Sequence, residues 1–413
     1  MRDSMLQSVF EQYYDRLAEM IQASFESVYW RQDRYLTGGI VESDERVDEG
    51  RKLYWPWCWP RTYILEPLLA TGEYGRARRF LEYWIKCQRP DGNWLHCYDV
   101  RDYSEYPGLA ETDNVGYMLW HFGKFFDATN DVSWISVNWE SVEKAGKFLE
   151  SKYNPEMKMI WGQEEANVPG MGKYKIRYSL HINCVCALGL QSSAKIARAI
   201  GKTETAKRWL EISESILSES IAQKFWDEKE KTFSFGFTES GERLTVPALW
   251  MTLMPFWLFD RFDERLADTL RYLKNRLYNK DPKISHTYWF YDYSVLIDSG
   301  KPVKSDYSGC GVWIGGLPVL IDALLKAGQA EQASEQIGKI VEWTNPENNL
   351  IPEHINTMHA GKLGNYSTYP KPYYYVDSGN LLHLSFFLTM IAKNIPKMLN
   401  RDNEGKDIHG EMV

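Results

Sequence analysis

ATGEYGRARRFLEYW, residues 70–84, has the pattern of a tight turn between two helices. Gly72 suits the left-handed backbone conformation that commonly ends a helix. Glu73 follows it, and an acidic side chain favours the beginning of the next helix. Two later segments share this design, AIGKTETAKRWLEIS at 199–213 and KAGQAEQASEQIGKI at 326–340. The chain is therefore predicted to repeat a unit of two helices.

Apolar residues recur at i, i+3, i+4 and i+7 over many other segments, which is the spacing of one helix face. This period predicts twelve helices, at residues 4–29, 61–71, 74–88, 111–129, 139–151, 177–200, 203–224, 246–258, 260–278, 311–327, 329–344 and 377–399. The remaining connections are long and carry clusters of Trp, Tyr, Asp and Glu.

Repeated helical hairpins are typical of a ring or of an open solenoid. Unequal linkers, with the aromatic residues on one set of loops, favour a closed ring of six hairpins, an (α/α)6 barrel. Its long loops would gather at one end and form a cleft. We expect a single all-α domain over residues 1–413. The last ~15 residues are expected to form a flexible tail, as chain ends often do.

Composition restricts the partners and the location of the protein. The net charge of −8 and a pI near 5.6 argue against nucleic acid as a partner, because binding phosphates requires clustered Lys and Arg. No membrane partner is expected, since no apolar run reaches about 18 residues. The first twenty residues lack the apolar core of a signal peptide. Six cysteines are too few for a disulfide scaffold, and Cys184 and Cys186 fit a helical core, so we expect a cytoplasmic protein.

Aromatic residues are unusually abundant, with 17 Trp, 26 Tyr and 17 Phe. Many lie in expected loops, in LYWPWCWPRTY (53–63), HTYWFYDYS (286–294) and YSTYPKPYYYVD (366–377). Aromatic faces stack on sugar rings and carboxylates bind sugar hydroxyls, so these clusters indicate a carbohydrate cleft. Packing of the loops against the core is the alternative interpretation.

Four segments bring polar groups to the long loops. They are WPRT (59–62), LAETDNVGYMLW (109–120), MIWGQEEANVPGMG (159–172) and NNLIPEHIN (348–356). Two carboxylates from distant loops are the equipment of a glycosidase, one as proton donor and the other as base or nucleophile. Glu164 and Glu165 lie near Trp161, and a neighbouring carboxylate together with an apolar ring would raise the pKa of an acid. Glu111 and Asp113 would also stabilise a helix start without any chemical role.

Other chemistries have less support in the sequence. Neither an HExxH nor a CxxC pair is present, so no metal or cofactor is expected. There is no GxSxG nucleophile elbow either. A histidine pair in the cleft would suit a sugar epimerase, and the four candidates are His181, His354, His359 and His383.

In order and spacing, residues 38 to 392 resemble glycoside hydrolase family 15, the glucoamylases with their glucodextranase, trehalase and isomaltose-hydrolase relatives. The similarity includes KLYWPWCWPRTYILEPLLATGEYGRARRFLEYW, which is similar to a W-x-R-D motif before a helix, and ETDNVGYMLWHF, similar to the next helix. IWGQEEA lies where the family has its general-acid loop. The segment ending in LIPEHI is similar to the base motif L-P-E-x, and VDSGNLLHLSFFLTMI to the helix that closes the barrel.

The resemblance implies an (α/α)6 six-hairpin barrel that hydrolyses α-glucosidic bonds with inversion. It makes Glu353 the general base, on a loop stiffened by proline, and Glu164 or Glu165 the general acid. Arg61 matches the arginine that binds the first sugar. The family has Asp at the next position, whereas this chain has Thr62, which implies a short substrate or an unusual terminal sugar.

The full set of predicted substrate-binding residues is Arg61, Thr62, Trp57, Trp59, Glu111, Asp113, Trp161, Trp313, His354 and Tyr374. Two alternatives remain beside an exo-acting hydrolase of short glycosides. One is a sugar epimerase, isomerase or lyase on the same barrel, and the other is a barrel that binds sugar without catalysis. Release of a reducing sugar separates the hydrolase from both.

Overall fold

A computed structural model describes residues 9–34, 40, 43–48, 51–55, 57–105, 111–162, 176–280, 284–290, 312–346, 348–356, 366–367, 374–378, 381–396 and 398–399. Side chains are not described at 43–48, 51–55, 57, 353–354, 356, 366–367 and 374–378. The predicted tail lies outside the described residues.

Helices make up most of the described chain. They are α2 (Tyr14–Arg34), α3 (Leu65–Ala70), α4 (Tyr74–Cys87), α5 (Thr112–Thr129), α6 (Val132–Val137), α7 (Trp139–Lys152), α8 (Leu180–Ala199), α9 (Thr203–Ser215), the π-helical η2 (Ile216–Lys224), α10 (Leu249–Leu258), the 3-10 turn η3 (Asp263–Arg265), α11 (Leu266–Leu277), α12 (Gly316–Lys326), α13 (Ala330–Trp343) and α14 (Leu381–Asn394).

Short strands form small antiparallel sheets between the helices. They are β1 (Ser43–Asp48), β2 (Arg51–Trp55), β3 (Trp57–Cys58), β4 (Tyr98–Asp99), β5 (Tyr153–Asn154), β6 (Met159–Ile160), β7 (Ile176–Ser179), β8 (Trp226–Asp227), β9 (Thr232–Phe233), β10 (Gly236–Thr238), β11 (Arg243–Leu244), β12 (Val312–Trp313), β13 (Pro352–Asn356), β14 (Tyr366–Ser367) and β15 (Tyr374–Ser378). The largest described sheet has the order β12-β13-β15-β14. These strands were not predicted, because strands of only two to six residues are defined by pairing partners that are distant in the sequence.

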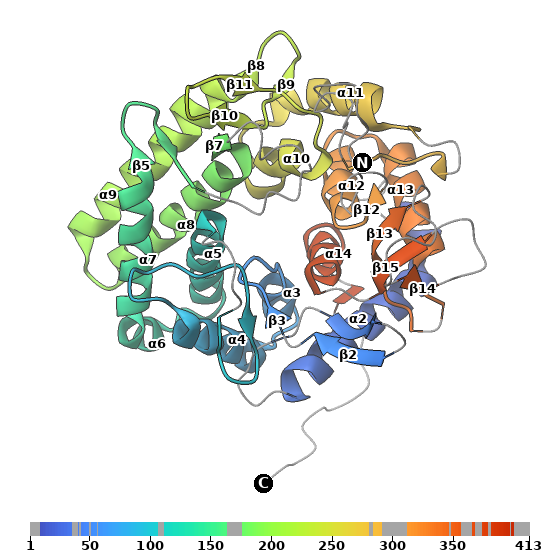
Figure 1. Ribbon diagram of the computed structural model, residues 1–413, viewed down its shortest axis with the longest axis horizontal. Helices are drawn as coiled ribbons and strands as arrows, with labels where there is room; N and C mark the ends of the chain where they lie inside the picture. Colours follow the sequence, from blue (N-terminus) through green and yellow to red (C-terminus); the bar gives the residue numbers. More distant parts are fainter. Residues whose placement is uncertain are drawn as a thin grey trace.

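Six helices form a closed inner ring (Figure 1). In chain order α3, α5, α8, α10, α12 and α14 each contact the next, and α14 returns to contact α3. The helices α2, α4, α7, α9, α11 and α13 lie outside this ring. The fold is therefore the (α/α)6 six-hairpin barrel predicted from the repeated hairpins.

Each of the twelve predicted helices has a counterpart, but several boundaries differ and one short helix was missed. The first helix continues to Arg34 rather than ending at 29, because Arg31 and Gln32 are buried although their side chains are polar. The sequence missed α6, which has only six residues and begins where the Asp131 side chain accepts a hydrogen bond from the backbone N–H of Trp134. A pattern of apolar residues detects neither a helix turn that buries polar side chains nor a helix of only six residues.

The three tight turns have one shared geometry. Gly72, Gly201 and Gly328 have φ values of 78°, 78° and 72°, in the left-handed region. In each turn the glycine N–H bonds to the carbonyl three residues before it, and the next N–H bonds to the carbonyl five residues before it. This pair of hydrogen bonds is the Schellman motif that ends helices. It confirms the turn predicted from the glycine spacing.

Aromatic and apolar side chains fill the middle of the ring. Tyr63 packs against Phe386 with ring centroids 4.4 Å apart, and its hydroxyl lies 3.0 Å from that of Tyr117. Burial raises the pKa of both tyrosines, so both stay neutral. Cys184 and Cys186 are fully buried in α8, as predicted for core residues.

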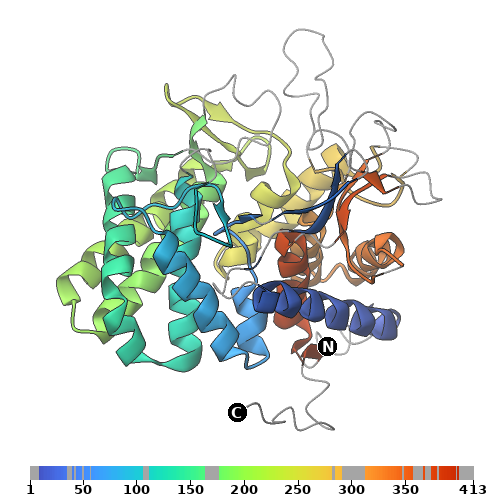
Figure 2. The same cartoon turned by 60° about the horizontal axis from the view of Figure 1, so that its bottom comes forward.

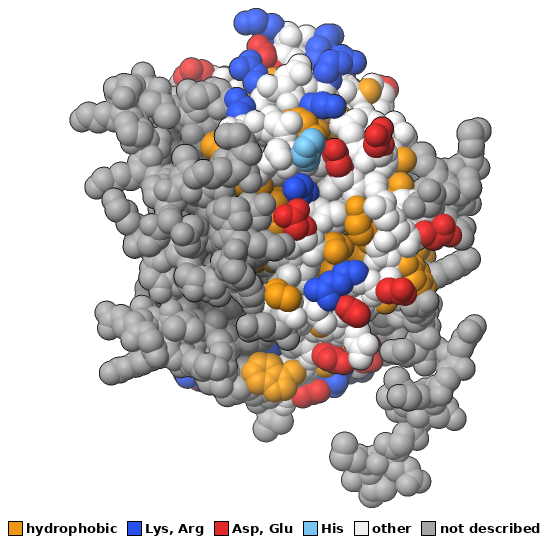
Figure 3. Space-filling view, turned by 90° about the vertical axis from the view of Figure 1, so that its right-hand side faces the viewer, with side chains coloured by type: hydrophobic (Ala, Val, Ile, Leu, Met, Phe, Trp, Pro, Cys, Tyr) orange, Lys and Arg blue, Asp and Glu red, His pale blue; other side chains and the backbone are white. Residues whose placement is uncertain are grey.

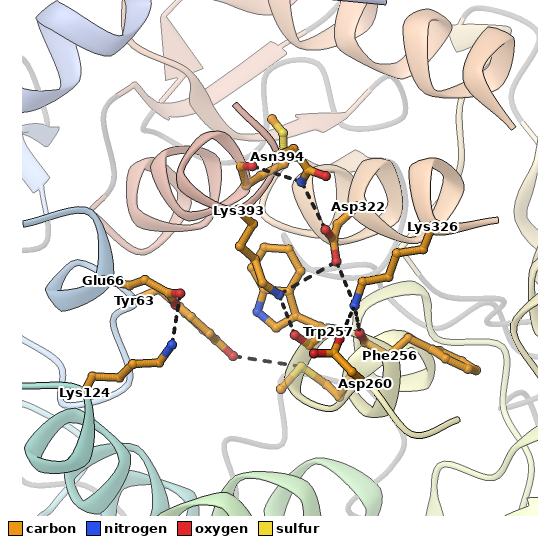
Figure 4. A network of polar contacts seen from close by, with 12 residues as sticks. Tyr63, Glu66, Lys124, Phe256, Trp257, Asp260, Asp322, Lys326, Lys393 and Asn394 are labelled. Atoms are coloured by element: carbon orange, nitrogen blue, oxygen red, sulfur yellow. Dashed lines mark hydrogen bonds and ion pairs between the residues drawn. The ribbon is translucent and has the colours of Figure 1, made fainter. Parts of the chain in front are cut away.

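Lysines close one end of the barrel (Figure 4). Lys326 donates to the carbonyl of Phe256 (2.7 Å) and Lys393 donates to that of Trp257 (2.6 Å), both near the C-terminus of α10. The buried Asp322 carboxylate lies 3.6 and 3.8 Å from the two ammonium groups. Cations at helix C-termini are stabilising. This end of the barrel is therefore a packed structural closure.

The strands gather at the opposite end, where the inner helices begin (Figure 2). On the face shown in Figure 3, acidic and basic side chains of the described residues are scattered among uncharged ones, with several Lys and Arg near the top. None of the described helices is both long enough and apolar enough to cross a membrane.

The turn glycines give a matched test of backbone strain. Gly201→Ala should destabilise the protein by about 1 kcal/mol, because an alanine in the left-handed region is strained. No atom lies within 4 Å of the added methyl group, so the loss would come from φ alone. Gly75 lies on the exposed surface of α4 and has equal space around it, so Gly75→Ala should stabilise by about 0.5–1 kcal/mol. Urea unfolding of wild type and both variants measures whether the free energy of unfolding falls for Gly201→Ala and rises for Gly75→Ala.

Candidate functional site

The predicted substrate-binding residues flank the beginnings of the inner helices. Arg61 and Thr62 precede α3, Glu111 is the N-cap of α5, and Asp113 lies in the first turn of that helix. Trp313 ends β12, just before α12. The barrel therefore brings these residues, which are distant in the sequence, to one end.

A row of four rings spans this end of the barrel. The rings of His181 and Trp250 have centroids 4.6 Å apart, those of Trp250 and Trp313 5.4 Å, and those of Trp313 and His383 4.7 Å. All four side chains are buried. Below them Tyr117 Oη lies 2.8 Å from Nε2 of His181. The two histidines are therefore linked by ring contacts through the two indoles.

A polar cluster lies beside this row. Glu111 Oε2 lies 3.7 Å from Arg61 Nη1 and 3.0 Å from His96 Nδ1. Trp59 donates its indole N–H to Nε2 of His96 at 2.7 Å. Glu111 is 1% exposed, whereas the side chains of Arg61 and His96 are 13% and 17% exposed. The cluster thus presents Arg61 and His96 to the surface and holds a carboxylate beneath them.

Two of the predicted residues are fully buried. Thr62 has no exposed surface, and its hydroxyl has no hydrogen-bond partner among the described residues. Asp113 has no exposed surface either, and its charge raises the pKa values of Tyr117 and Cys186 in addition to their burial. Both residues therefore lie beneath the surface of the site in this conformation.

The segment that leads to the predicted acid is anchored on α5. The α-carbon of Gly162 packs so closely on Thr112 that a side-chain β-carbon there would lie 2.1 Å from the threonine hydroxyl. The Gly162 N–H also bonds to the carbonyl of Arg177 at 3.1 Å. The chain therefore leaves the described part beside the N-terminus of α5. Glu164 and Glu165 themselves lie outside the described residues.

Trp161 is held by two cations. The ammonium group of Lys152 and the guanidinium carbon of Arg177 each lie 3.8 Å from the centroid of the indole. Burial, and secondarily the charge of Arg177, lower the pKa of Lys152. Cation–π contacts of this kind fix an aromatic side chain. The ring that was expected to stack on a sugar thus already has two cationic neighbours, and it stiffens the chain before the acid segment.

Glu353 lies on a strand, which corrects the prediction of a loop. β13 pairs with β12 through Trp313 and His354, and with β15 on its other side, where Asn356 lies opposite Tyr374. Pro352 is its first residue, a position where the missing proline N–H is tolerated. The strand that carries Glu353 is therefore paired on both sides, through residues that flank Glu353. The side chains of Trp57, Glu353, His354 and Tyr374 lie outside the described residues, as does all of His359.

The sequence missed two histidines of this region. His96 joins Trp59 to Glu111 but lies in an irregular segment whose only signal was its proximity to aromatic residues. His121 is fully buried in α5 and contacts the carbonyls of Pro60 and Thr62. It therefore anchors the turn that carries Arg61. Neither role is visible in a sequence, because each depends on contacts between elements.

Comparisons with known proteins agree with this architecture. No family model matches the chain. An uncharacterized glycosyl hydrolase of Methanocaldococcus jannaschii is 24% identical over 320 residues, which cover 73% of this chain and 49% of that protein. The chain thus spans about half the length of that relative.

Solved structures show the same fold at low identity. A glycosidase variant in complex with glucose aligns with a TM-score of 0.64 at 14% identity and covers 93% of this chain and 98% of that one. A bacterial glucoamylase complexed with acarbose also aligns with a TM-score of 0.64 at 14% identity, covering 92% of this chain and 57% of that one. These similarities establish the barrel fold.

His121 should make the protein sensitive to acid. Burial lowers its pKa to about 4, while its carbonyl contacts oppose that shift. The unfolded chain takes up this proton near pH 6.5, so stability falls as the pH drops from 6.5 towards 4, by about 3 kcal/mol in total. His121→Gln lacks this proton uptake. Urea unfolding at pH 7, 5.5 and 4.5 should show wild type losing its advantage over the variant as the pH falls. A constant difference would contradict this assignment.

Proposed function

We propose that this protein is a glycoside hydrolase that cleaves short α-glucosides with inversion. One observation carries the proposal: both segments with candidate catalytic carboxylates are anchored at the same end of a glycosidase-type barrel. Gly162, the last described residue before Glu164 and Glu165, packs against Thr112, and β12 pairs with the strand of Glu353 through Trp313 and His354. The resemblance to glucoamylases assigns the same segments to acid and base.

In this proposal Glu353 is the general base and activates a water molecule. Glu164 or Glu165 is the general acid that protonates the oxygen of the leaving group. Inverting glycosidases hold these two carboxyl groups about 6.5–9.5 Å apart, which leaves room for the water. The sheet that carries Glu353 suits this role, because a base must stay in hydrogen-bond reach of the water.

Sugar binding is assigned to the rim of the aromatic row. Arg61 offers N–H donors to sugar hydroxyls, and its ion pair with Glu111 restricts the guanidinium orientation. Trp59 contributes partly exposed aromatic surface next to it. Trp313, which is only 9% exposed, and Trp57, His354 and Tyr374 are proposed as further contacts. The relatives bound to glucose and to acarbose support a small carbohydrate as the ligand.

The rival epimerase would need two histidines that act on one sugar carbon together. Of its four candidates, His181 and His383 are linked by ring contacts through Trp250 and Trp313, and the side chains of His354 and His359 lie outside the described residues. A binding protein without catalysis differs from the proposal in a measurable way. Only the hydrolase releases a reducing sugar from a panel of disaccharides and aryl α-glycosides.

Glu353→Gln should abolish most turnover. The amide keeps the shape of the side chain but cannot accept a proton from water, so kcat should fall by about 10²–10⁴-fold while KM changes little. Glu105→Gln, which removes a carboxylate from an exposed ion pair with Arg89, is the matched control and should keep its rate. Full activity in Glu353→Gln would remove Glu353 from the mechanism.

The stereochemistry of the product tests the mechanism separately. A base that activates water delivers it to the face opposite the leaving group, so an α-glycoside should first release the β-anomer. A proton NMR time course with an aryl α-glycoside resolves the two anomers before mutarotation mixes them. Initial release of the α-anomer would show retention and make one carboxylate a nucleophile.

A further inference from the structure

Position 62 lacks the carboxylate that the glucoamylase resemblance leads us to expect beside Arg61. The glucoamylase resemblance places a carboxylate there, whereas this chain has a threonine that is completely buried. Its hydroxyl bonds to no described residue. Thr62 therefore does not replace the missing acceptor at the surface of the site.

Glu111 brings a carboxylate to the same guanidinium from the neighbouring helix. The contacts of this carboxylate are one-sided: Arg61, His96 and Asn114 all approach Oε2, at 3.7, 3.0 and 3.4 Å. None of the described hydrogen bonds and ion pairs of Glu111 reaches Oε1. A carboxylate has about four acceptor positions, and a nearly buried one is costly to leave half used. The geometry thus leaves Oε1 as an acceptor for a ligand.

His96 lies between Trp59 and Glu111 in one tautomer. The indole N–H of Trp59 can only donate, so Nε2 of His96 must accept with its lone pair. The proton of the neutral ring therefore sits on Nδ1, the nitrogen that lies 3.0 Å from Glu111 Oε2. The contact between Nδ1 and Oε2 does not have the geometry of a hydrogen bond, so His96 restricts the carboxylate by close packing.

We infer that Glu111 accepts a hydroxyl of the terminal sugar through Oε1, in place of the missing carboxylate at position 62, and that His96 is the positioning residue that aims it. The inference rests on the proposed function. The substrate class that it implies is a glycoside whose terminal sugar is neutral and has a free hydroxyl to donate. The acceptor has moved from the start of α3 to the start of α5, so Arg61 keeps a carboxylate partner while the recognised hydroxyl is approached from another helix.

Substrates that lack one hydroxyl test the assignment directly. Aryl α-glucosides deoxygenated singly at C2, C3, C4 or C6 would be compared with the parent glycoside in wild type, Glu111→Gln and Glu111→Ala. With wild type, kcat/KM should fall by about 10- to 100-fold for one of the deoxy substrates. The hydroxyl missing from that substrate is the one that Glu111 accepts, and its loss leaves a buried charged acceptor unpaired. With Glu111→Ala that penalty should disappear, and Glu111→Gln should retain only part of it.

The positioning role of His96 has its own variants. His96→Ala should raise KM and reduce the same hydroxyl discrimination, with a smaller change in kcat. His96→Asn keeps an N–H near the place of Nδ1 and should recover most of the discrimination, which a purely structural role would not predict. His286 is the matched control, since it also lies against a glutamate, Glu335 at 3.5 Å, but on the exposed surface. His286→Ala should leave the substrate profile unchanged.

The outcomes separate the inference from the proposed function. Suppose that wild type hydrolyses the glycosides and that Glu111→Ala loses as much kcat/KM on each deoxy substrate as wild type does. This result would overturn the inference but not the proposed function. Calorimetric binding of glucose without any hydrolysis would reject the proposed function, and a weaker binding in Glu111→Ala would then still support the role of Glu111. Absence of both binding and hydrolysis in wild type would overturn both. Thermal unfolding of each variant verifies that the fold is intact.

Discussion

Closure of the inner ring is the constraint on which the rest of the molecule depends. Because α14 returns to contact α3, the six inner helices enclose one core and begin at one end. Helix N-termini carry partial positive charge, so this end favours carboxylates. Glu111 and Asp113 at the start of α5 follow from that electrostatics as much as from any chemistry. The opposite end needs cations instead, and Lys326 and Lys393 supply them.

The sequence predicted what depends on local patterns. Apolar periodicity located the helices, and the glycine turns indicated the repeated hairpins that close into a barrel. It did not predict the strand that holds Glu353, because β13 is defined by partners at Trp313 and in β15 rather than by its own composition. Arg61 and Glu111 were each predicted to bind substrate, but their ion pair was not, since two helices have to meet to form it. His96 escaped notice for the same reason.

The high aromatic content serves two purposes, which the sequence could not separate. Trp84, Trp94, Trp209 and Trp343 are completely buried and stabilise the barrel by packing. Trp59 and Trp161 are partly exposed, yet both make polar or cationic contacts that hold neighbouring groups in place. An aromatic residue in an irregular segment can thus orient its neighbours, whether or not it also offers its face to a ligand. Only the contacts around each ring distinguish these roles.

The seam between the first and last inner helices has a consequence for biosynthesis. The Tyr63 N–H bonds to the Ser385 hydroxyl at 3.0 Å, across 322 residues, and the hydroxyl of Thr389 donates to the Tyr63 carbonyl. Such distant contacts form late, because a long loop has to close before they are made. A ribosome must therefore release nearly the whole chain before the ring can seal. Until then the nascent protein exposes an unsealed apolar edge to chaperones, and the end of the barrel that carries the candidate site is completed only in the last stage of folding.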